Sequence, residues 1–460
     1  MFRSKINTVL NLESPMDKVL VKGWIRTRRD SKSFSFIELN DGSCLENLQI
    51  IASDTLENYK EIKNLTTGTS ISVTGKMLES PGKGQKWELH AANLNVIGLS
   101  PETYPLQKKR HTDDFLRTIA HLRPRTNKYG ATFRIRSELS FAVHKFFREK
   151  NFYYVHTPII TASDCEGAGE LFRVTAFDLD NVPKTDGKTD YSMDFFGKEA
   201  KLTVSGQLSG EMLALALGDI YTFGPTFRAE NSNTRRHAAE FWMVEPEMAF
   251  CDLFENMDIA EELIKSLTAH ILSHCCSDIK LFEKFVDKKL LSRLEKTLSE
   301  SFVRITYEDA VNIIKNSGKT FEHELRFGKP LQAEHERFLA ENHFDGPVIV
   351  YHYPKNISPF YMRLNDDHLT VANMDILLPT VGEIIGGSQR EERLDILISR
   401  MEDLGLNQQD YWWYIDSRKF GTVPHSGFGL GFERMMMFLT GISNIRDVTV
   451  FPRTPKNIEF

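Results

Sequence analysis

The residues best suited to chemistry in this sequence are arginines and carboxylates that stand beside glycines and aromatic rings. Arg228 and Glu230 lie in a Phe-Arg-Ala-Glu stretch. An arginine at this place would pair with the α-phosphate of a nucleotide through two hydrogen bonds and stabilise the charge that develops there during attack. Glu230 would accept a hydrogen bond from an adenine amino group. The stretch is therefore compatible with a nucleotide site, in which Arg228 could pair with the α-phosphate.

The loop and strand that follow would supply the rest of this nucleotide site. Arg236 and His237 are adjacent in a basic loop, from which their side chains would reach the outer phosphates. Phe241 comes next, and its ring would stack on adenine. Surface ion pairs around a buried Phe241 are the alternative interpretation of this segment taken alone.

A second candidate for nucleotide binding is the run Gly-Phe-Gly-Leu-Gly-Phe-Glu-Arg at residues 427–434. Glycines let the backbone approach a ligand closely. Arg434 falls in the first turn of a predicted helix, where it would lie over one face of adenine as a cation–π partner. Arg228 and Arg434 are therefore the candidate catalytic residues.

The composition is that of a multidomain globular protein. The chain has 460 residues, of which 41% are hydrophobic and 26% charged, so two or three domains are expected. A net charge of −6 argues against a general nucleic-acid binder. Five cysteines without a Cys-x-x-Cys pair predict neither a disulfide framework nor structural zinc. Without an apolar run long enough to span a bilayer, or a recognisable leader, we expect a cytoplasmic protein with no membrane partner.

The first part of the chain reads as short strands in which apolar and polar residues alternate. Turn-forming residues separate them: Asp41 and Gly42, Gly68, and the run Pro-Gly-Lys-Gly at residues 81–84. Five strands within about 80 residues are typical of a small closed β-barrel of the OB type, with Val, Ile and Leu filling the interior. The predicted strands cover residues 19–24, 34–39, 48–51 and 70–74, and a last one begins at residues 87–90.

A basic cluster stands next to two aromatic residues of this barrel. Arg26, Arg28 and Arg29 precede Phe34 and Phe36. Base stacking on exposed rings beside a basic edge is how such barrels hold single-stranded nucleic acid. The two phenylalanines share one face of the predicted strand, so they lie either both inside or both outside the barrel. The pattern by itself favours a place in the core for both.

The rest of the chain mixes helical and strand patterns, which predicts an α+β domain. Residues 101–126 lose any periodic pattern and are basic, as expected of a hinge. The strands predict a mainly antiparallel sheet flanked by helices, without a βαβ phosphate loop. Helical spacing marks residues 133–146, a helix-rich region at 257–340 and the end of the run 427–440, while strand patterns mark residues 152–155, 202–204, 220–227, 348–353 and 371–377.

Three segments of this second part resemble the three motifs of the class II aminoacyl-tRNA synthetases. They are the predicted helix at 133–146 with the strand that ends at Pro158, the segment 227–241 and the glycine-rich run 427–434. Their order and spacing match the family. In this family the first motif forms the interface of a homodimer, and the other two hold ATP in a bent form.

The barrel adds a resemblance to one subclass, the aspartate, asparagine and lysine enzymes, in which it reads the anticodon. This resemblance implies an OB-fold domain at residues 1–100, a hinge at 101–130 and a catalytic domain at 131–460. Phe36 stands where the aspartate and asparagine enzymes stack an anticodon base, and Gln49 where they read one.

The resemblance also implies a Mg²⁺ site at the phosphates of ATP. Magnesium takes oxygen ligands, so it needs carboxylates within reach of the phosphates. Asp375 and Glu383 match the family's metal carboxylates. A solvent-facing Asp375 without a metal is the alternative.

The residues that choose the amino acid differ within the subclass. The stretch that ends at Arg390 resembles both the aspartate and the asparagine enzymes, in which this arginine holds the side-chain oxygen of the substrate. Aspartate enzymes have a lysine, paired with the substrate carboxylate, where this chain has Glu211. A carboxylate there suits the amide donors of asparagine and would repel aspartate by several kcal/mol. A structural salt bridge is the alternative role for Glu211.

Further stretches also resemble the asparagine enzymes, namely Tyr-Trp-Trp-Tyr at residues 411–414 and Gly-Thr-Val-Pro-His-Ser-Gly at 421–427. The run Cys-Glu-Gly-Ala at 165–168 matches the mobile loop that closes on the substrate, so Glu166 is a candidate partner for the α-ammonium group. The resemblance thus implies a homodimeric ligase that uses ATP and Mg²⁺ to activate L-asparagine and then loads it onto tRNA(Asn).

Three other functions are compatible with parts of this pattern. The first is an aspartyl enzyme, including one that charges the tRNAs for both aspartate and asparagine, against which Glu211 argues. The second is a tRNA-independent asparagine synthetase built on the same catalytic unit, against which the barrel argues. The third is a non-catalytic RNA-binding protein, which the presence of Arg228, Glu383 and Arg434 disfavours.

Overall fold

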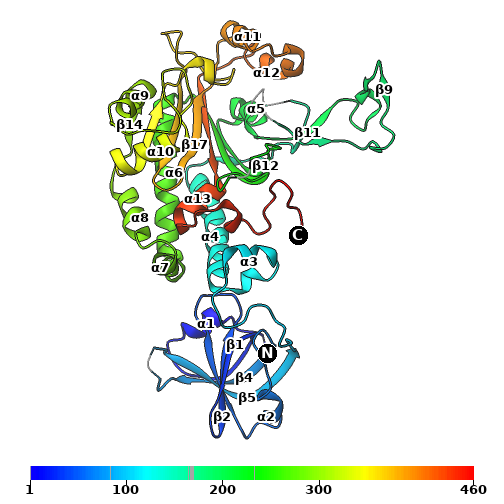
Figure 1. Cartoon of the computed structure of the whole chain (residues 1–460), viewed down its shortest axis with the longest axis vertical. Coiled ribbons are helices and arrows are strands. Elements are labelled where there is room, and N and C mark those ends of the chain that lie inside the picture. Colours follow the sequence, from blue (N-terminus) through cyan, green and yellow to red (C-terminus); the bar gives the residue numbers. More distant parts are fainter. Residues whose placement is uncertain (1, 83, 164, 166–169, 233) are drawn as a thin grey trace. The chain divides into compact units, whose positions relative to one another are not determined.

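The computed structural model describes residues 2–82, 84–163, 165, 170–232 and 234–460. Contacts between Cα atoms divide the chain into two compact units, residues 1–133 and residues 134–460. The first unit is coloured blue to cyan in Figure 1. Each unit contains buried hydrophobic clusters of its own.

The first unit is built around a closed barrel, whose strands follow the order β1-β2-β3-β5-β4 in the part of the chain that is described (Figure 1). Neighbouring strands pair antiparallel, except for β3 and β5, which are parallel. The strands predicted from the sequence are confirmed, and each extends beyond its predicted range. They are β1 (Met16–Asp30), β2 (Phe34–Asn40), β3 (Leu48–Ser53), β4 (Ser70–Glu79) and β5 (Trp87–Gly98).

Strand β2 settles which of its residues face the barrel interior. Ser35, Ile37 and Leu39 are buried, whereas Phe34 and Phe36 are only half-buried on the outer face. The expectation that both phenylalanines belong to the core is therefore wrong. Side chains alternate along a strand, so the odd-numbered residues of β2 point into the barrel. Aliphatic side chains from the other strands pack against them and complete the core.

Short helices accompany the barrel, and the basic segment 101–126 contains some of them. Asp113 begins α3 and accepts hydrogen bonds from Nζ of Lys128 at 2.7 Å and from the hydroxyl of Tyr129 at 3.1 Å. These two donors lie in the first turn of α4 (Asn127–Glu149). The shorter elements are α1 (Ile6–Leu10), α2 (Tyr59–Ile62), α3 (Asp113–Thr118) and the 3₁₀ helix η1 (Arg123–Arg125).

The second unit has an eight-stranded sheet, counted over its described residues, in the order β14-β15-β16-β17-β18-β13-β12-β6. Its pairs are antiparallel apart from β14 with β15 and β12 with β6. This confirms the predicted antiparallel sheet. The strands are β6 (Tyr153–Tyr154), β12 (Asp219–Phe227), β13 (Glu240–Ala249), β14 (Val303–Thr306), β15 (Val348–Tyr351), β16 (Asn373–Leu378), β17 (Gly382–Gln389) and β18 (His425–Gly431).

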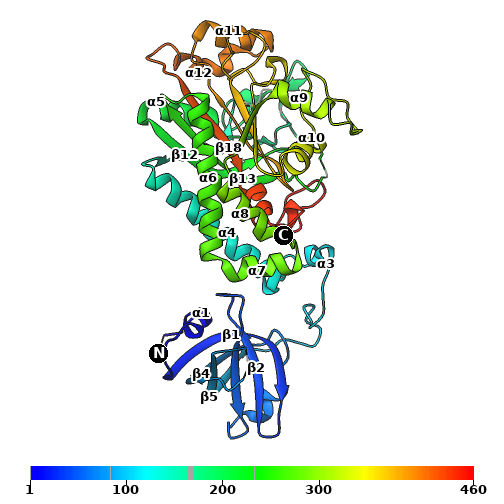
Figure 2. The ribbon, with the colours of Figure 1, turned by 90° about the vertical axis from the view of Figure 1, so that its left-hand side faces the viewer.

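Helix α6 (Leu253–His274) packs across β16, β17 and β18, and α5 (Gln207–Leu217) packs on β12 and β13. A capping box formed by Asp252 and Glu255 starts α6, whose buried side chains recur every three or four residues. Figure 2 shows α6 running along the sheet, with α7 and α8 beside it. None of the helices described is long and apolar enough to cross a membrane.

The remaining helices confirm the helix-rich region predicted at 257–340 and the helix after the glycine-rich run. The α-helices are α7 (Cys276–Phe285), α8 (Leu290–Ser299), α9 (Tyr307–Lys315), α10 (Ala333–Arg337), α11 (Leu394–Asp403), α12 (Trp412–Asp416) and α13 (Phe432–Thr440). The other helical turns are η2 (Tyr191–Met193), η3 (Phe338–His343), η4 (Lys355–Ile357), η5 (Gln408–Tyr411) and η6 (Ile445–Asp447).

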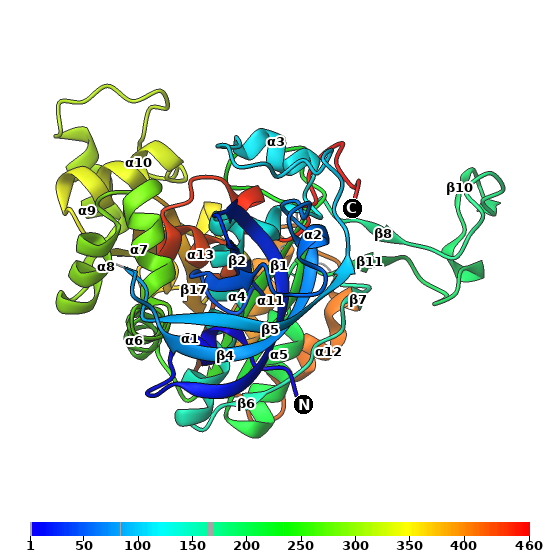
Figure 3. The same cartoon turned by 90° about the horizontal axis from the view of Figure 1, so that it is seen from below.

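A narrow arm projects from the second unit between β7 and α5 (Figures 1 and 3). Its base is a small sheet of β7 (Ile160–Thr161), β11 (Ala200–Leu202) and β8 (Arg173–Val174), and its tip is the pair β9 (Lys184–Thr185) and β10 (Lys188–Thr189). Of its strands the sequence predicted only one, at residues 202–204, and β11 ends where that range begins; the others are too short for an alternation to show.

The orientation of β2 gives a test of the barrel core. Ile37→Ala should lower the local free energy of unfolding by about 2–4 kcal/mol, because it removes buried methyl groups and leaves a cavity. Phe36→Ala should cost about 1 kcal/mol or less, since its ring is half in water. Hydrogen exchange of peptides from residues 16–98 in the full chain measures both. Equal losses for the two variants would mean that Phe36 is a core residue after all.

Candidate active site

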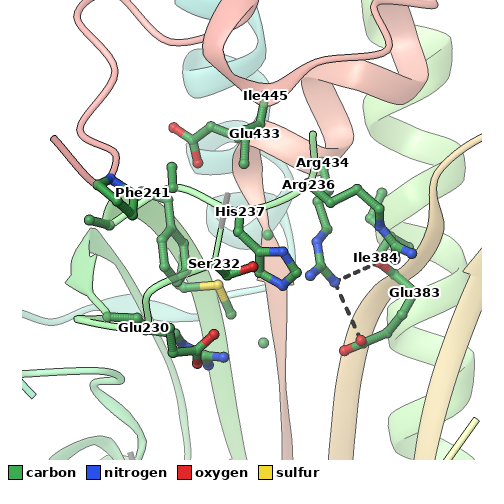
Figure 4. A pocket seen from close by; sticks show the side chains of 17 residues that line it. Glu230, Ser232, Arg236, His237, Phe241, Glu383, Ile384, Glu433, Arg434 and Ile445 are labelled. Carbon is green, nitrogen blue, oxygen red and sulfur yellow. Dashed lines mark hydrogen bonds and ion pairs between the residues drawn. The ribbon is translucent and has the colours of Figure 1, made fainter. Parts of the chain in front are cut away.

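One pocket of the second unit gathers the side chains that the sequence assigned to ATP (Figure 4). Its walls come from the β12–β13 hairpin and its loop, from the start of β17, and from β18 with the first turn of α13. Residues far apart in the sequence therefore meet at one place. The predicted residues that line it are Arg228, Glu230, Arg236, His237, Phe241, Glu383 and Arg434.

The hairpin fixes Arg228 and Phe241 against each other. Thr226 pairs with Phe241 across β12 and β13, and the backbone N–H of Arg228 donates to the carbonyl of Ala239 at 2.9 Å. The guanidinium of Arg228 lies 5.6 Å from the centroid of the Phe241 ring, close enough for a cation–π contact. The antiparallel pairing thus places a cation and an aromatic face at the mouth of the pocket.

His237 enters this pocket as a neutral side chain. Burial lowers its pKa below the usual value, and the nearby cation of Arg434 lowers it further. Its Nδ1 lies 2.5 Å from the hydroxyl of Thr234. At physiological pH, His237 therefore offers hydrogen bonds to a phosphate and not a full positive charge.

The opposite wall depends on a residue that the sequence analysis missed, Glu336 of α10. Its Oε2 accepts from Nη2 of Arg236 at 3.0 Å and from the backbone N–H of Glu383 at 3.1 Å. Arg434 in turn donates to the carbonyl of Glu383 at 2.8 Å. Gly382 has a φ of +80° and lies against Glu336, so a side chain there would be strained. Glu336 lies in the helix-rich region where no motif was recognised, so no sequence signal could have found it.

The two candidate metal carboxylates converge on one glycine. Asp375 pairs with Gly386 across β16 and β17, and a bulge between Ile376 and Leu377 shifts Glu383 to the same side. A Cβ added at Gly386 would lie 3.4 Å from Oε1 of Glu383 and 3.5 Å from Oδ1 of Asp375. Burial and the adjacent Glu383 carboxylate raise the pKa of Asp375 well above its usual value. Two carboxylate oxygens that come this close to one point are a donor set that suits a divalent cation.

Arg390 and Glu211, assigned to the amino acid, lie together in the interior. Arg390 is 2% exposed and Glu211 is 0% exposed, and Nε of the arginine lies 3.8 Å from Oε1 of the glutamate. Arg390 also donates to both carboxylate oxygens of Glu247, at 3.1 and 2.5 Å, and to the hydroxyl of Ser388 at 3.0 Å. The guanidinium is therefore held in one orientation by a bidentate pair.

Glu211 accepts hydrogen bonds from several sides at once. Gln207 donates to its Oε1 at 3.0 Å, Arg418 donates to its Oε2 at 2.7 Å, and the hydroxyl of Tyr414 and Nε2 of His425 lie at 2.8 and 3.1 Å from Oε2. Burial alone would raise the pKa of Glu211, but Arg418, His425 and Arg390 outweigh it and lower the pKa. Glu211 is therefore ionised and acts only as an acceptor.

Sequence reasoning did not identify the residues that hold this pair. Tyr414 and His425 lie within stretches noted as matches, but nothing in their spacing shows that they meet Glu211. Glu247 lies in β13, where alternation predicts which face of the sheet its side chain is on but not which residue it contacts. Burial and the negative charge of the neighbouring Glu211 raise the pKa of Glu247. Gly427 makes room for Glu247, because an added Cβ would collide with that carboxylate. Glu166, the candidate partner of the ammonium group, lies outside the described residues.

The candidate anticodon residues share the outer face of the barrel in the first unit. Phe36 pairs with Ile51, and Gln49 pairs with Glu38 across β2 and β3, so Phe36 and Gln49 are diagonal neighbours. The guanidinium of Arg29 lies 5.9 Å from the Phe36 ring centroid. A ring, an amide and a cation on one strand pair are what base stacking and base-edge reading require.

Comparison with known proteins agrees with this geometry. Residues 113–455 match the family described as tRNA synthetases class II (D, K and N), and residues 19–97 match the OB-fold nucleic acid binding domain. An asparagine–tRNA ligase of Oleidesulfovibrio alaskensis is 59% identical over 461 residues, which is 100% of both chains. One from Clostridium tetani is 59% identical over 96% of each chain.

The fold is also that of a solved relative. The asparaginyl-tRNA synthetase of Pyrococcus horikoshii, solved with asparaginyl-adenylate, matches with a TM-score of 0.88 and 31% identity over 100% of this chain and 99% of that one. The predicted fold class and the family resemblance are thereby confirmed. The chain belongs to the class II tRNA synthetases of the aspartate, lysine and asparagine group and, within that group, to the asparagine–tRNA ligase family.

Proposed function

We propose that this enzyme activates L-asparagine with ATP and transfers it to tRNA(Asn). In the first step an α-carboxylate oxygen of asparagine attacks the α-phosphorus, the bond to the β-phosphate breaks, and pyrophosphate leaves. In the second step a hydroxyl of the terminal adenosine attacks the carbonyl carbon, and AMP leaves. The observation that carries the choice of asparagine is the ionised, buried Glu211 beside Arg390.

The cationic side chains of the pocket in Figure 4 neutralise the negative charge of the phosphates. Adenylate formation needs little acid–base help, because the attacking carboxylate is already ionised, so positioning and charge neutralisation dominate. Arg228 binds the α-phosphate, Phe241 and Arg434 hold adenine, and Glu230 accepts from its amino group. Arg236 and His237 bind the outer phosphates. That these side chains line one pocket supports the assignment.

Asp375 and Glu383 hold Mg²⁺ in this proposal. The convergence of their oxygens on Gly386 supports it, as does the raised pKa of Asp375. The ion would offset the phosphate charge when ATP is bound. Glu383 also forms an ion pair with Arg434, whose Nη1 lies 3.4 Å from Oε2 of the glutamate. This pair positions the adenine-binding and metal-binding residues together.

Asparagine is favoured over aspartate by the chemistry around Arg390. The arginine donates to the side-chain oxygen that both amino acids carry. Only asparagine has N–H groups for an ionised Glu211, and the amide of Gln207 already makes a bond of this kind to Oε1 at 3.0 Å. Aspartate would place a second carboxylate against Glu211 in a buried site, which costs several kcal/mol.

Recognition of the tRNA is assigned to the barrel. Phe36 stacks an anticodon base and Gln49 reads one, which their shared outer face supports. The barrel, the hinge and the catalytic domain take the boundaries 1–100, 101–130 and 131–460. The reaction is placed in the cytoplasm, where its tRNA is found.

The enzyme is proposed to act as a homodimer through α4 and β6. Phe141 of α4 is 59% exposed, and Tyr153 and Tyr154 of β6 are 54% and 40% exposed. Exposed aromatic rings beside an edge strand of the sheet mark a protein contact surface. In a two-fold symmetric dimer, a second copy of the same chain would cover the exposed rings and the edge strand of both subunits.

ATP–pyrophosphate exchange with each amino acid tests the proposed substrate. Wild type should exchange with asparagine and at least about a hundredfold less with aspartate. Glu211→Gln should lower the ratio of kcat/KM for asparagine over aspartate by about tenfold or more, because the carboxylate that repels aspartate is gone. Asp287→Asn, which breaks an arginine pair outside the pocket, is the matched control. Exchange with aspartate alone would exclude the asparagine assignment, and no exchange at all would favour an RNA-binding role.

Gly427→Ala tests whether Glu247 positions Arg390. The new methyl group displaces the Glu247 carboxylate, so KM for asparagine should rise about tenfold or more while KM for ATP changes little. Gly224→Ala is the control, because an added Cβ there meets nothing within 4 Å. Steady-state exchange kinetics measure both. An unchanged KM for asparagine would separate Glu247 from substrate binding.

Phe36→Ala tests the reading of the anticodon by the barrel. Loss of one stacked base costs about 1–3 kcal/mol, so kcat/KM for tRNA should fall by about five- to a hundredfold in aminoacylation assays. Exchange without tRNA should stay at the wild-type rate, because the chemistry lies in the other unit. A variant that charges tRNA normally would remove Phe36 from the interface.

A further inference from the structure

Outside the active site, two neighbouring helices bring together two histidines and a glutamate. Glu138 comes from α4, and His270 and His274 come from the last part of α6. Each offers one possible ligand atom, and among the described residues these three atoms lie within 4.8 Å of one another. The proposed reaction uses none of them.

The spacing of the two histidines explains the cluster. Residues four apart share one face of a helix, so both imidazoles project toward α4. Their rings are stacked with centroids 4.0 Å apart and an interplanar angle of 13°. Oε1 of Glu138 lies 2.7 Å from Nε2 of His270, so the carboxylate closes the third side.

A backbone contact orients His274 as a ligand. Its Nδ1 lies 2.9 Å from the carbonyl oxygen of His270. A carbonyl oxygen only accepts, so Nδ1 carries the hydrogen, and in the neutral ring Nε2 presents its lone pair. Metal-binding histidines are commonly fixed in this way through their other nitrogen.

The surroundings neither compete with this site nor repel a cation from it. Arg134, the adjacent cation on α4, is bound by both carboxylate oxygens of Asp278 at 3.0 and 2.6 Å. The neighbouring Cys275 is buried and is not among the side chains whose ligand atoms come together here. The donor set is therefore two imidazole nitrogens and one carboxylate oxygen.

We propose that Glu138, His270 and His274 bind one divalent transition-metal ion of the zinc class, with water as the fourth ligand. Zinc favours this mixture of nitrogen and oxygen, whereas magnesium takes oxygen alone. Ligands at about 2.0–2.1 Å from zinc lie about 3.3 Å apart in a tetrahedron. To reach that distance, the exposed His274 ring leaves its stack on His270, and the Glu138–His270 hydrogen bond opens to admit the ion. The ion would tie α4 to α6.

Zinc titration of the full-length enzyme tests the site, with metal removed beforehand by a chelator and Mg²⁺ in excess to occupy the active-site carboxylates. Isothermal calorimetry should show one bound Zn²⁺. His274→Ala and Glu138→Gln should each weaken Kd at least about tenfold. His323→Ala is the matched control, because His323 also pairs with a glutamate, at 3.1 Å, but belongs to no such cluster, so Kd should not change.

Thermal unfolding gives a second readout that does not depend on activity. Zinc should raise the melting temperature of wild type and of His323→Ala, since it binds the folded state, and should leave that of His274→Ala unchanged. His274 is exposed, so its replacement leaves the fold intact. Zinc binding that survives His274→Ala, or that is lost in Cys276→Ser instead, would overturn the proposal. So would the lack of any zinc binding by wild type.

Discussion

The proposed amino-acid site depends on one buried carboxylate, that of Glu211. A carboxylate without access to water is unstable unless it is paired and fully hydrogen-bonded. Its partners Arg418, Tyr414 and His425 come from the end of α12 and from β18, and Arg390 lies just after β17. Hydrogen bonding to this one charge therefore joins segments that are as much as 214 residues apart, and it leaves Glu211 able only to accept hydrogen bonds.

The residues proposed to bind the nucleotide and those proposed to bind the amino acid share the same two strands. On β17, Gly386 lies next to the oxygens of Asp375 and Glu383, and on β18, Gly427 leaves space for Glu247. The two glycines lie close in the ladder, because Gly427 pairs with Ser388. Since hydrogen-bonded strands cannot slip without losing their pairing, the phosphate-binding and side-chain-binding groups keep a fixed separation, which in-line attack requires.

Helix α6 links this sheet to the cluster of Glu138, His270 and His274, which it shares with α4. Its buried face packs on β16, β17 and β18, and its last turns carry His270 and His274. A metal ion between α4 and α6 would act on the support of the site and not on its chemistry. The proposed selectivity for the tRNA comes instead from the barrel, because the rings and amides on its outer face are not part of its core.

The sequence by itself determined the barrel strands, the antiparallel sheet, and the residues that line the candidate nucleotide pocket, because alternation, helical spacing and glycine-rich runs are local signals. It also determined Glu211 and Arg390, through family motifs that cover the whole chain. It misplaced Phe36, and it gave no sign of Glu336 or Glu247. Only the tertiary structure decided those. Alternation along β2 does not say which of its faces is the interior, and Glu336 and Glu247 act through arginines 100 and 143 residues away, a separation that leaves no periodic trace along the chain.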